Sequence, residues 1–236
     1  MAGFSGRTDA RFVVPPTHRI DMPDSSTIRL EVFSDYTCPW CYVGWARLTK
    51  ALEQLPPGMS VEVDWRPFEI HPEVPLSGMP VEDLGYPPDV WARMQDALKA
   101  NAAAEGLDVG KRPKVSNTHR ALLAGAWAQQ ERSQLFSAFH ERLFGGYFAE
   151  GRDLGDPGVV NDLAVSVGID PDGMSAAIDG GAWEHALRQA TADAREMGIT
   201  GAPTFVFDRR FAASGAQPVE VLFRAFDSAL ATRHGS

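Results

Sequence analysis

Cysteine is scarce in this sequence, with only two in 236 residues. A closed structural zinc site needs four ligands, which two cysteines and six dispersed histidines are poorly suited to supply. We therefore expect no metal site. A c-type haem attachment is also excluded, because it needs histidine directly after the second cysteine and Tyr42 stands there.

A long hydrophobic run is also lacking. No apolar stretch approaches the roughly 18 residues that cross a bilayer, so we expect no membrane partner. The first residues have neither the apolar core of a secretory signal nor the acid-poor composition of a transit peptide. We expect residues 1–26 to form a flexible N-terminal arm. We also expect a cytoplasmic protein, since reducing conditions disfavour a purely structural disulfide.

Positive charge is in deficit, with 22 basic residues against 31 acidic ones and a net charge of −9. This balance argues against a nucleic-acid partner and against an anionic membrane surface. The acidic residues are spread along the chain, which favours a role in solubility. Hydrophobic residues make up 44%, as in ordinary soluble globular proteins.

Alternating apolar and polar residues predict strands at 28–34 and 61–65. Between them, one apolar stripe predicts an amphipathic helix packed on a core; its members are Cys41, Trp45, Leu48, Leu52 and Leu55. Strand, helix and strand form a βαβ unit, whose two strands we expect to be parallel.

From residue 80 to 196 the pattern is helical throughout. Asp156-Pro157 and Asp170-Pro171 are two of its predicted helix starts. Two short strands at 204–207 and 210–214 and a C-terminal helix follow. We therefore predict an α/β fold in which residues 27–79 and 197–236 form one discontinuous domain and residues 80–196 form an inserted all-helical domain.

The two cysteines lie in "SDYTCPWCY", directly after the first strand and at the start of the first helix. This context favours a redox dithiol over two thiols that are neighbours by chance. Cys38 falls at the helix start, where unpaired N–H groups and the helix dipole stabilise a thiolate. Cys41 shares the apolar stripe of the helix. We therefore expect an exposed nucleophile at Cys38 and a buried resolving thiol at Cys41, with Pro39 and Trp40 shaping the surface beside them.

A second candidate feature is "GITGAPTFVF", in which Pro203 precedes a predicted strand. A plain entry from a loop into a strand would explain it. The alternative is a cis Ala202–Pro203 bond beside the cysteines, with the Ala202 backbone free to pair with a substrate.

Together, "FSDYTCPWCYVGWARL", the long helical segment and "GITGAPTFVF" resemble the DsbA-like branch of the thioredoxin superfamily. The nearest group is the cytosolic FrnE-like proteins, whose relatives include 2-hydroxychromene-2-carboxylate isomerases and kappa-class glutathione transferases. The resemblance covers roughly residues 28–230. It implies a thioredoxin fold with a helical insertion and a dithiol–disulfide oxidoreductase. Cys38 then matches the nucleophile, Cys41 the resolving cysteine and Pro203 the cis-proline.

One departure from the family pattern concerns the proton chemistry. Many thioredoxin-like proteins carry a buried carboxylate where Val32 stands here, and Glu31 is one residue off that position. Glu31 and Asp35 are therefore further candidates for a proton-shuttling acid. His119 could overhang the active site, although an exposed histidine near a helix start is the simpler interpretation.

We expect thiol or disulfide substrates, either proteins or small molecules, and a monomer or homodimer. The redox-active disulfide is the only group that this chemistry requires, and glutathione is a candidate co-substrate. Two alternatives stay open. One is a glutathione-dependent isomerase or transferase on the same fold, and the other is a chaperone-like binding module without catalysis.

Overall fold

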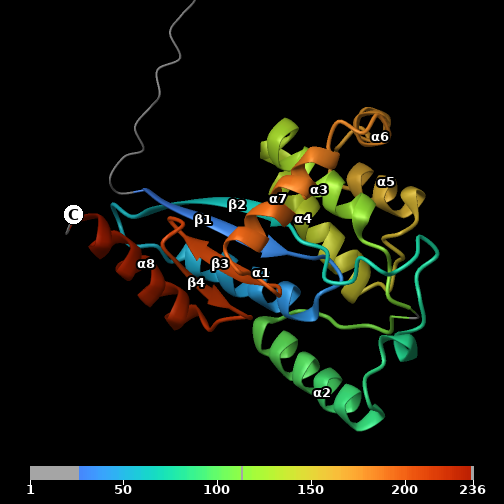
Figure 1. Ribbon diagram of the computed structural model, residues 1–236, viewed down its shortest axis with the longest axis horizontal. Helices are drawn as coiled ribbons and strands as arrows, with labels where there is room; N and C mark the ends of the chain where they lie inside the picture. The colour runs from blue at the N-terminus through green and yellow to red at the C-terminus, as the bar shows by residue number, and fades with distance from the viewer. Residues whose placement is uncertain (1–26, 113, 235–236) are drawn as a thin grey trace, which may run out of the picture.

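A computed structural model describes residues 27–112 and 114–234 (Figure 1). The predicted N-terminal arm, residues 1–26, lies outside the described residues. The elements in chain order are β1 (Thr27–Ser34), α1 (Pro39–Glu53), β2 (Ser60–Pro67), η1 (Val81–Leu84), α2 (Pro88–Glu105), α3 (His119–Glu131), α4 (Ser133–Phe148), α5 (Pro157–Val165), α6 (Pro171–Asp179), α7 (Glu184–Glu196), β3 (Thr204–Phe207), β4 (Phe211–Ser214) and α8 (Val219–His234).

The four strands form one mixed sheet in the order β2-β1-β3-β4. β1 and β2 are parallel, as the βαβ pattern predicts, while β3 is antiparallel to both β1 and β4. Asp208 and Arg209 make the β3–β4 turn with φ angles of 51° and 54°. Both lie in the left-handed region that tight hairpin turns require.

The two faces of the sheet are covered by different helices. Every second residue of β1, namely Ile28, Leu30 and Val32, is buried against α1 and α8. On the opposite face, Phe33 and Val206 pack against Ala190 and Ala194 of α7. α7 thus connects the helical block to the sheet, and Figure 1 shows it crossing between them.

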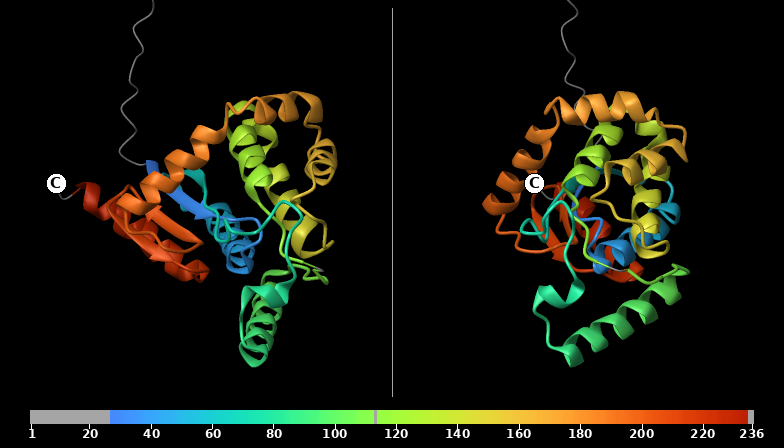
Figure 2. Two further views of the ribbon diagram at one scale, coloured as in Figure 1. Left: turned by 45° about the vertical axis from the view of Figure 1, so that its right-hand side comes forward. Right: turned by 90° about the vertical axis from the view of Figure 1, so that its right-hand side faces the viewer.

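α3, α4, α5 and α6 form a helical block beside the sheet (Figure 2). Its buried aromatic core includes Phe139, Phe144 and Phe148. The predicted caps are present, since Asp156 accepts from the Gly158 N–H and Asp170 accepts from the N–H groups of Asp172 and Gly173.

α2 lies apart from that block and is attached to α1 (Figure 2). Glu105 near the C-terminal end of α2 pairs with Arg47 at 2.7 Å and with Lys50 at 2.8 Å. Arg47 also donates to Asn101. These contacts hold α2 on the helix that begins at the cysteines.

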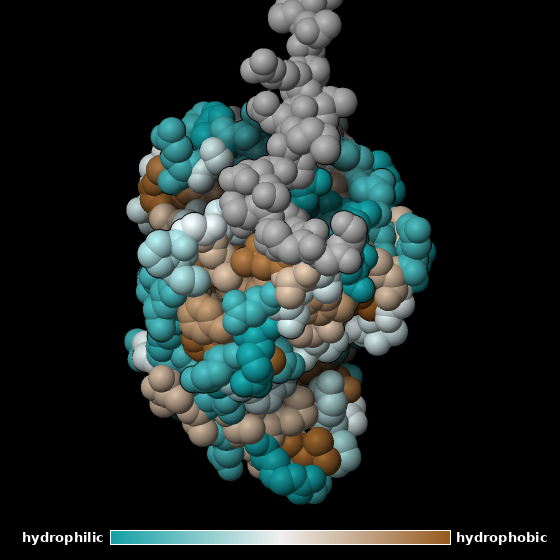
Figure 3. All heavy atoms as spheres, turned by 90° about the vertical axis from the view of Figure 1, so that its left-hand side faces the viewer, coloured by the Kyte–Doolittle hydropathy of each residue, from teal (hydrophilic) through white to brown (hydrophobic). Residues whose placement is uncertain are grey.

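Figure 3 views the end of the molecule at which β1 begins and α8 ends. Hydrophilic residues dominate this face, and hydrophobic residues occur in small, separate groups. Within the described ranges, no helix combines the length and apolarity needed to cross a membrane.

Candidate active site

The two cysteines lie at the N-terminus of α1, where the strand β1 ends. Cys38 is the N-cap residue, with extended φ and ψ of −75° and 116°, and Pro39 opens the helix. The Cys38 N–H donates to the Asp35 carbonyl at 3.2 Å, which closes the turn after β1. The Cys38 carbonyl in turn accepts from the N–H of Cys41 at 3.0 Å. A strand, one turn and a proline-started helix therefore fix the position of both thiols.

Both thiols are free and both are buried. Cys38 is 4% exposed and Cys41 is 1% exposed. The expectation of an exposed Cys38 is thus wrong. The physical reason is the segment before β3, which covers the sulfur: Cys38 Sγ donates to the Ala202 carbonyl at 3.3 Å.

The environment of Cys41 differs from that of Cys38. Burial raises the pKa of the Cys41 thiol well above its ordinary value, and its hydrogen bond and electrostatic interaction with Cys38 add to the shift. The Asp35 backbone and the Ser34 side chain also hydrogen-bond to the Cys41 sulfur and oppose the shift in part. Cys41 is therefore held as a neutral thiol.

The structure brings Ala202 and Pro203 to the cysteines. The Ala202–Pro203 peptide bond is cis. Pro203 is buried against α1 at Gly44, where a Cβ would lie 3.1 Å from the Pro203 ring. Three apolar side chains of the same cluster, those of Trp40, Ile70 and Ala202, are only partly buried. Both sulfurs thus lie among mainly apolar side chains.

Asp35 is 1% exposed and organises the loop before Cys38. Its carboxylate accepts from the N–H and hydroxyl of Thr37, at 2.8 and 2.9 Å, from the Ile70 N–H at 3.0 Å and from the Thr118 hydroxyl at 3.1 Å. Burial raises the pKa of this carboxyl, although the four donors act in the opposite direction. The carboxylate is therefore committed to the loop and to α3.

Glu31 and His119 are not brought to the thiols by any contact among the described residues. Glu31 lies on the α7 face of the sheet, where its carboxylate receives two hydrogen bonds of 2.7 Å from Arg209. His119 hydrogen-bonds to Glu69 and to Glu184, both at 2.9 Å. Burial alone would lower the pKa of His119, but these two carboxylates raise it overall. His119 thus joins α3, α7 and the segment after β2.

The sequence interpretation missed four residues near the thiols: Ser34, Tyr36, Gly44 and His140. Gly44 carried a usable signal, because a glycine inside a helix is unfavourable unless another group must approach closely. Ser34 and Tyr36 stand in the quoted motif, but nothing in the sequence shows that His140, 104 residues after Tyr36, bonds to it.

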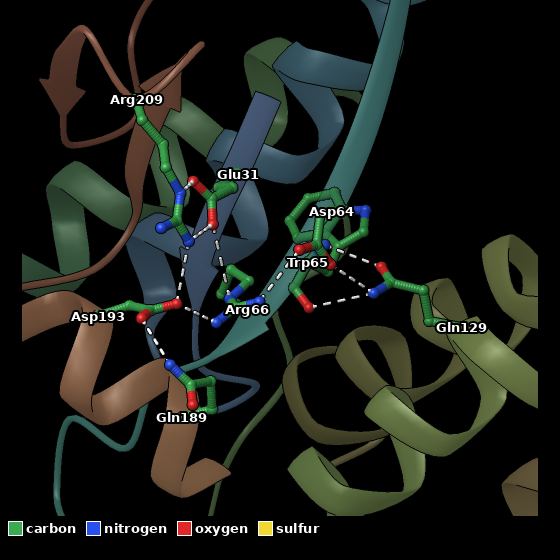
Figure 4. Close-up of polar contacts among 8 residues, drawn as sticks. All are labelled: Glu31, Asp64, Trp65, Arg66, Gln129, Gln189, Asp193 and Arg209. Carbon is green, nitrogen blue, oxygen red and sulfur yellow. Dashed lines mark hydrogen bonds and ion pairs between the residues drawn. The ribbon is translucent and has the colours of Figure 1, made fainter. Parts of the chain in front are cut away.

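A pocket of about 780 Å³ lies elsewhere, over the α7 face of the sheet. Its lining includes Glu31, Arg66 and Arg209 and neither cysteine. Figure 4 shows Arg66 and Arg209 paired with Asp193, and Arg209 also paired with Glu31. Residues 27–112 and 114–234 hold no group of three or more histidine, cysteine and acidic side chains suited to a metal ion.

Comparison with known proteins agrees with this geometry. Residues 29–227 match the DSBA-like thioredoxin domain family. The uncharacterized protein YwbO of Bacillus subtilis is 30% identical over 182 residues, which are 76% of this chain and 86% of YwbO. The crystal structure of a probable DsbA oxidoreductase from Streptomyces coelicolor is 34% identical with a TM-score of 0.78, covering 86% of this chain and 89% of that one.

Two more distant structures share the fold. A 2-hydroxychromene-2-carboxylate isomerase is 16% identical with a TM-score of 0.66, over 85% of this chain and 95% of its own. The cytosolic disulfide reductase DsbM from Pseudomonas aeruginosa, solved with GSH, is 18% identical with a TM-score of 0.56. The match covers 88% of this chain and 98% of DsbM. The expected α/β thioredoxin fold with a helical insertion is confirmed. The chain belongs to the DSBA-like thioredoxin domain family.

Proposed function

We propose that the protein is a thiol–disulfide oxidoreductase that works by dithiol–disulfide exchange between Cys38 and Cys41. The observation that carries the proposal is the pair of free thiols one helical turn apart, with Cys38 at the helix N-cap and against the Ala202 carbonyl. Helix N-termini favour the thiolate, which is the reactive form.

In the reductive direction, the Cys38 thiolate attacks a substrate disulfide. A Cys38–substrate disulfide forms and one substrate thiolate leaves. Cys41, once deprotonated, then attacks the Cys38 sulfur, so that the intramolecular disulfide forms and the second substrate thiolate leaves. Two electrons pass from the dithiol to the substrate, and the two cysteine protons end on the two substrate thiols. The reverse sequence oxidises a substrate dithiol.

The hydrogen bond from Cys38 to Ala202 suggests how substrate is held. The thiol form of Cys38 donates to the Ala202 carbonyl, whereas Cys38 in the mixed disulfide has no proton to donate. That carbonyl then becomes an acceptor for an N–H of a bound peptide. The partly exposed apolar groups around the sulfurs, including Trp40, favour peptide or small organic disulfides over charged substrates.

Cytoplasmic location and glutathione as a co-substrate belong to this proposal. The cytosolic reductase DsbM, which shares the fold and was solved with GSH, supports both. An isomerase on the same fold is the second candidate, because a 2-hydroxychromene-2-carboxylate isomerase is among the similar structures. Cysteine at position 38, where that group typically has serine, favours redox chemistry.

Insulin reduction with two single variants tests the proposal. Cys38→Ser removes the nucleophile and is expected to reduce turnover to the uncatalysed rate. Cys41→Ser keeps the first step, so a mixed disulfide on Cys38 is expected to accumulate and be visible by mass spectrometry. Wild-type turnover in both variants would overturn the proposal. Aggregation suppression that persists in both would instead support the binding module.

A further inference from the structure

A small cavity of about 20 Å³ lies between the end of β1, the end of β2 and the helices α3 and α4. Its lining includes Ser34, Tyr36, Trp65, Phe136 and His140. One water needs a cavity of roughly 10–15 Å³ and two to four polar partners. The cavity therefore has room for a single water molecule.

His140 offers this cavity a polar atom without a partner. The residue is 3% exposed and is surrounded by aromatic rings, among them Trp65 at 4.2 Å between ring centroids. Burial lowers the pKa of His140 to about 3, so the imidazole is neutral. Its Nδ1 lies 2.8 Å from the Tyr36 hydroxyl, while Nε2 has no hydrogen-bond partner among the described residues.

The direction of the Tyr36–His140 hydrogen bond sets which imidazole nitrogen carries the hydrogen. Burial raises the pKa of Tyr36, so its hydroxyl keeps its proton and needs an acceptor. Among the described residues, Nδ1 of His140 is the acceptor within reach, and with the hydroxyl donating to it the imidazole hydrogen lies on Nε2 as a buried donor. An unsatisfied buried donor destabilises the fold, and a bound water would relieve that cost by accepting its hydrogen bond.

Ser34 connects the cavity to the thiol. It follows Ile28, Leu30 and Val32 in the two-residue period of β1 and so faces α1. Its side chain hydrogen-bonds to the Cys41 sulfur, and it also lines the cavity. In the sheet it pairs with Pro67 of β2, next to Trp65 on the same face.

We propose that this cavity binds one water between His140 Nε2 and the Ser34 hydroxyl, and that Ser34 and the water form the proton route of Cys41. The inference rests on the proposed dithiol function. It assigns a proton route to a chain that has Val32 where relatives carry a buried carboxylate. The partly exposed residues Trp65, Arg66 and Phe136 form the outer wall, where the water exchanges protons with solvent.

The step follows formation of the Cys38–substrate disulfide. Cys41 gives its proton to the Ser34 oxygen while Ser34 gives its own to the water, which releases a proton to solvent. The Cys41 thiolate then attacks the Cys38 sulfur, the bond from Cys38 to the substrate breaks, and the leaving thiolate takes a proton from solvent. His140 takes no proton, because its pKa is too low. It is a positioning residue for the water.

Single-turnover kinetics with a disulfide-linked fluorogenic peptide separates the two steps. Release of the first peptide thiol reports attack by Cys38, and release of the second reports attack by Cys41. Ser34→Ala is expected to slow the second step about tenfold or more while leaving the first unchanged. Ser34→Thr, which keeps a hydroxyl, is expected to restore it. Ser228→Ala, a serine on the exposed face of α8, is the matched control.

His140→Phe tests the other partner of the water. It is expected to slow the second step in the same way and to reduce its solvent deuterium isotope effect. Since the variant could fail to fold, the Ser34 pair tests the proposal independently. Second-step rates within twofold of wild type in both Ser34→Ala and His140→Phe would overturn the water relay. Failure of the proposed dithiol function would give a different result from failure of the relay. In that case Cys38→Ser would still release the first peptide thiol.

Discussion

At the scale of single residues, Asp35 shows how one buried side chain fixes the approach to a reactive thiol. Its carboxylate receives four hydrogen bonds. The donors are the N–H and hydroxyl of Thr37, the Ile70 N–H and the Thr118 hydroxyl. These donors come from the loop before Cys38, the segment after β2 and the start of α3. The position of the Cys38 turn thus depends on three parts of the chain.

Asp35→Asn is expected to lower the free energy of unfolding by about 1–3 kcal/mol. All four partners of the carboxylate donate, so the amide NH₂ of asparagine would face two donors and leave the Ile70 N–H or the Thr37 N–H unsatisfied. Urea denaturation measures the change. Asp108→Asn, at an exposed position, is the control and should stay within about 0.5 kcal/mol. Equal stability of the two variants would contradict this role of Asp35.

The sequence predicted the two cysteines as a pair, because their spacing and helix-start context are local properties. It did not predict the burial of Cys38 or the use of Asp35 as an acceptor. Both depend on Ala202, Ile70 and Thr118, which reach the site only through the fold. A single carboxylate in a loop carries no sequence pattern that reveals how many donors will surround it.

At the scale of elements, the helical block is joined to the active-site loop by a close approach of α3. Gly125 of α3 faces Tyr36, and a Cβ at this glycine would lie only 2.3 Å from the Tyr36 hydroxyl oxygen. Tyr36 is itself 4% exposed and packs on Phe144 at 5.0 Å between centroids. The contact therefore leaves no space for a larger residue.

Gly125→Ala is expected to destabilise the fold by about 1–3 kcal/mol, because the buried Tyr36 ring must move. Gly145→Ala in α4 is the matched control. A Cβ there meets only the Arg142 side chain at 3.9 Å, so this change should stabilise the protein by about 0.5–1 kcal/mol. Thermal unfolding of both variants measures the contrast. A stabilising Gly125→Ala would show that α3 does not pack on Tyr36 in this way.

Periodicity predicted most elements with small shifts at their ends. The first strand and helix, the parallel partner strand, the hairpin and the capped helices are local patterns of apolar and capping residues. The packing of α7 on the sheet is different. Its apolar residues, including Ala190 and Ala194, fit a helical bundle and a sheet face equally well, so periodicity alone does not reveal which surface they cover.

At the scale of the whole molecule, a partly buried charge network joins α7 to the sheet (Figure 4). Asp193 of α7 accepts from Arg66 of β2 at 2.5 Å and from Arg209 of the β3–β4 turn at 3.0 Å. Arg209 also binds Glu31 of β1. Side chains from β1, β2, α7 and the β3–β4 turn thus meet at one place. The role of Glu31 therefore could not be predicted from its neighbours in the sequence.

Asp193→Asn is expected to destabilise the protein at neutral pH by about 1–3 kcal/mol, since Arg66 and Arg209 each lose a carboxylate partner. Burial would raise the pKa of Asp193, but Gln189, Arg66 and Arg209 lower it overall below the ordinary 3.8. Because the pKa is lower in the folded state, the ionised Asp193 stabilises the fold at pH values above 3.8. This stability is lost as the pH falls through the folded-state pKa. The gap between wild type and variant should therefore be constant above about pH 5 and shrink below about pH 4.

Denaturation between pH 3 and pH 8 measures this gap. Asp162→Asn is the control, because Asp162 pairs with Arg152 with 70% of its side chain exposed and should contribute less than about 1 kcal/mol. A gap that grows on acidification would contradict the charge network as the link between α7 and the sheet.

The central claim is that Cys38 and Cys41 act together as a two-electron couple, and a redox titration tests it most directly. The purified protein is equilibrated in glutathione buffers of graded potential, and its free thiols are counted by alkylation and mass spectrometry. We predict that both thiols are lost together with a two-electron dependence, a tenfold change in the equilibrium ratio for about 30 mV. Loss of one thiol only, as a lasting glutathione adduct on Cys38 with Cys41 still free, would contradict the account.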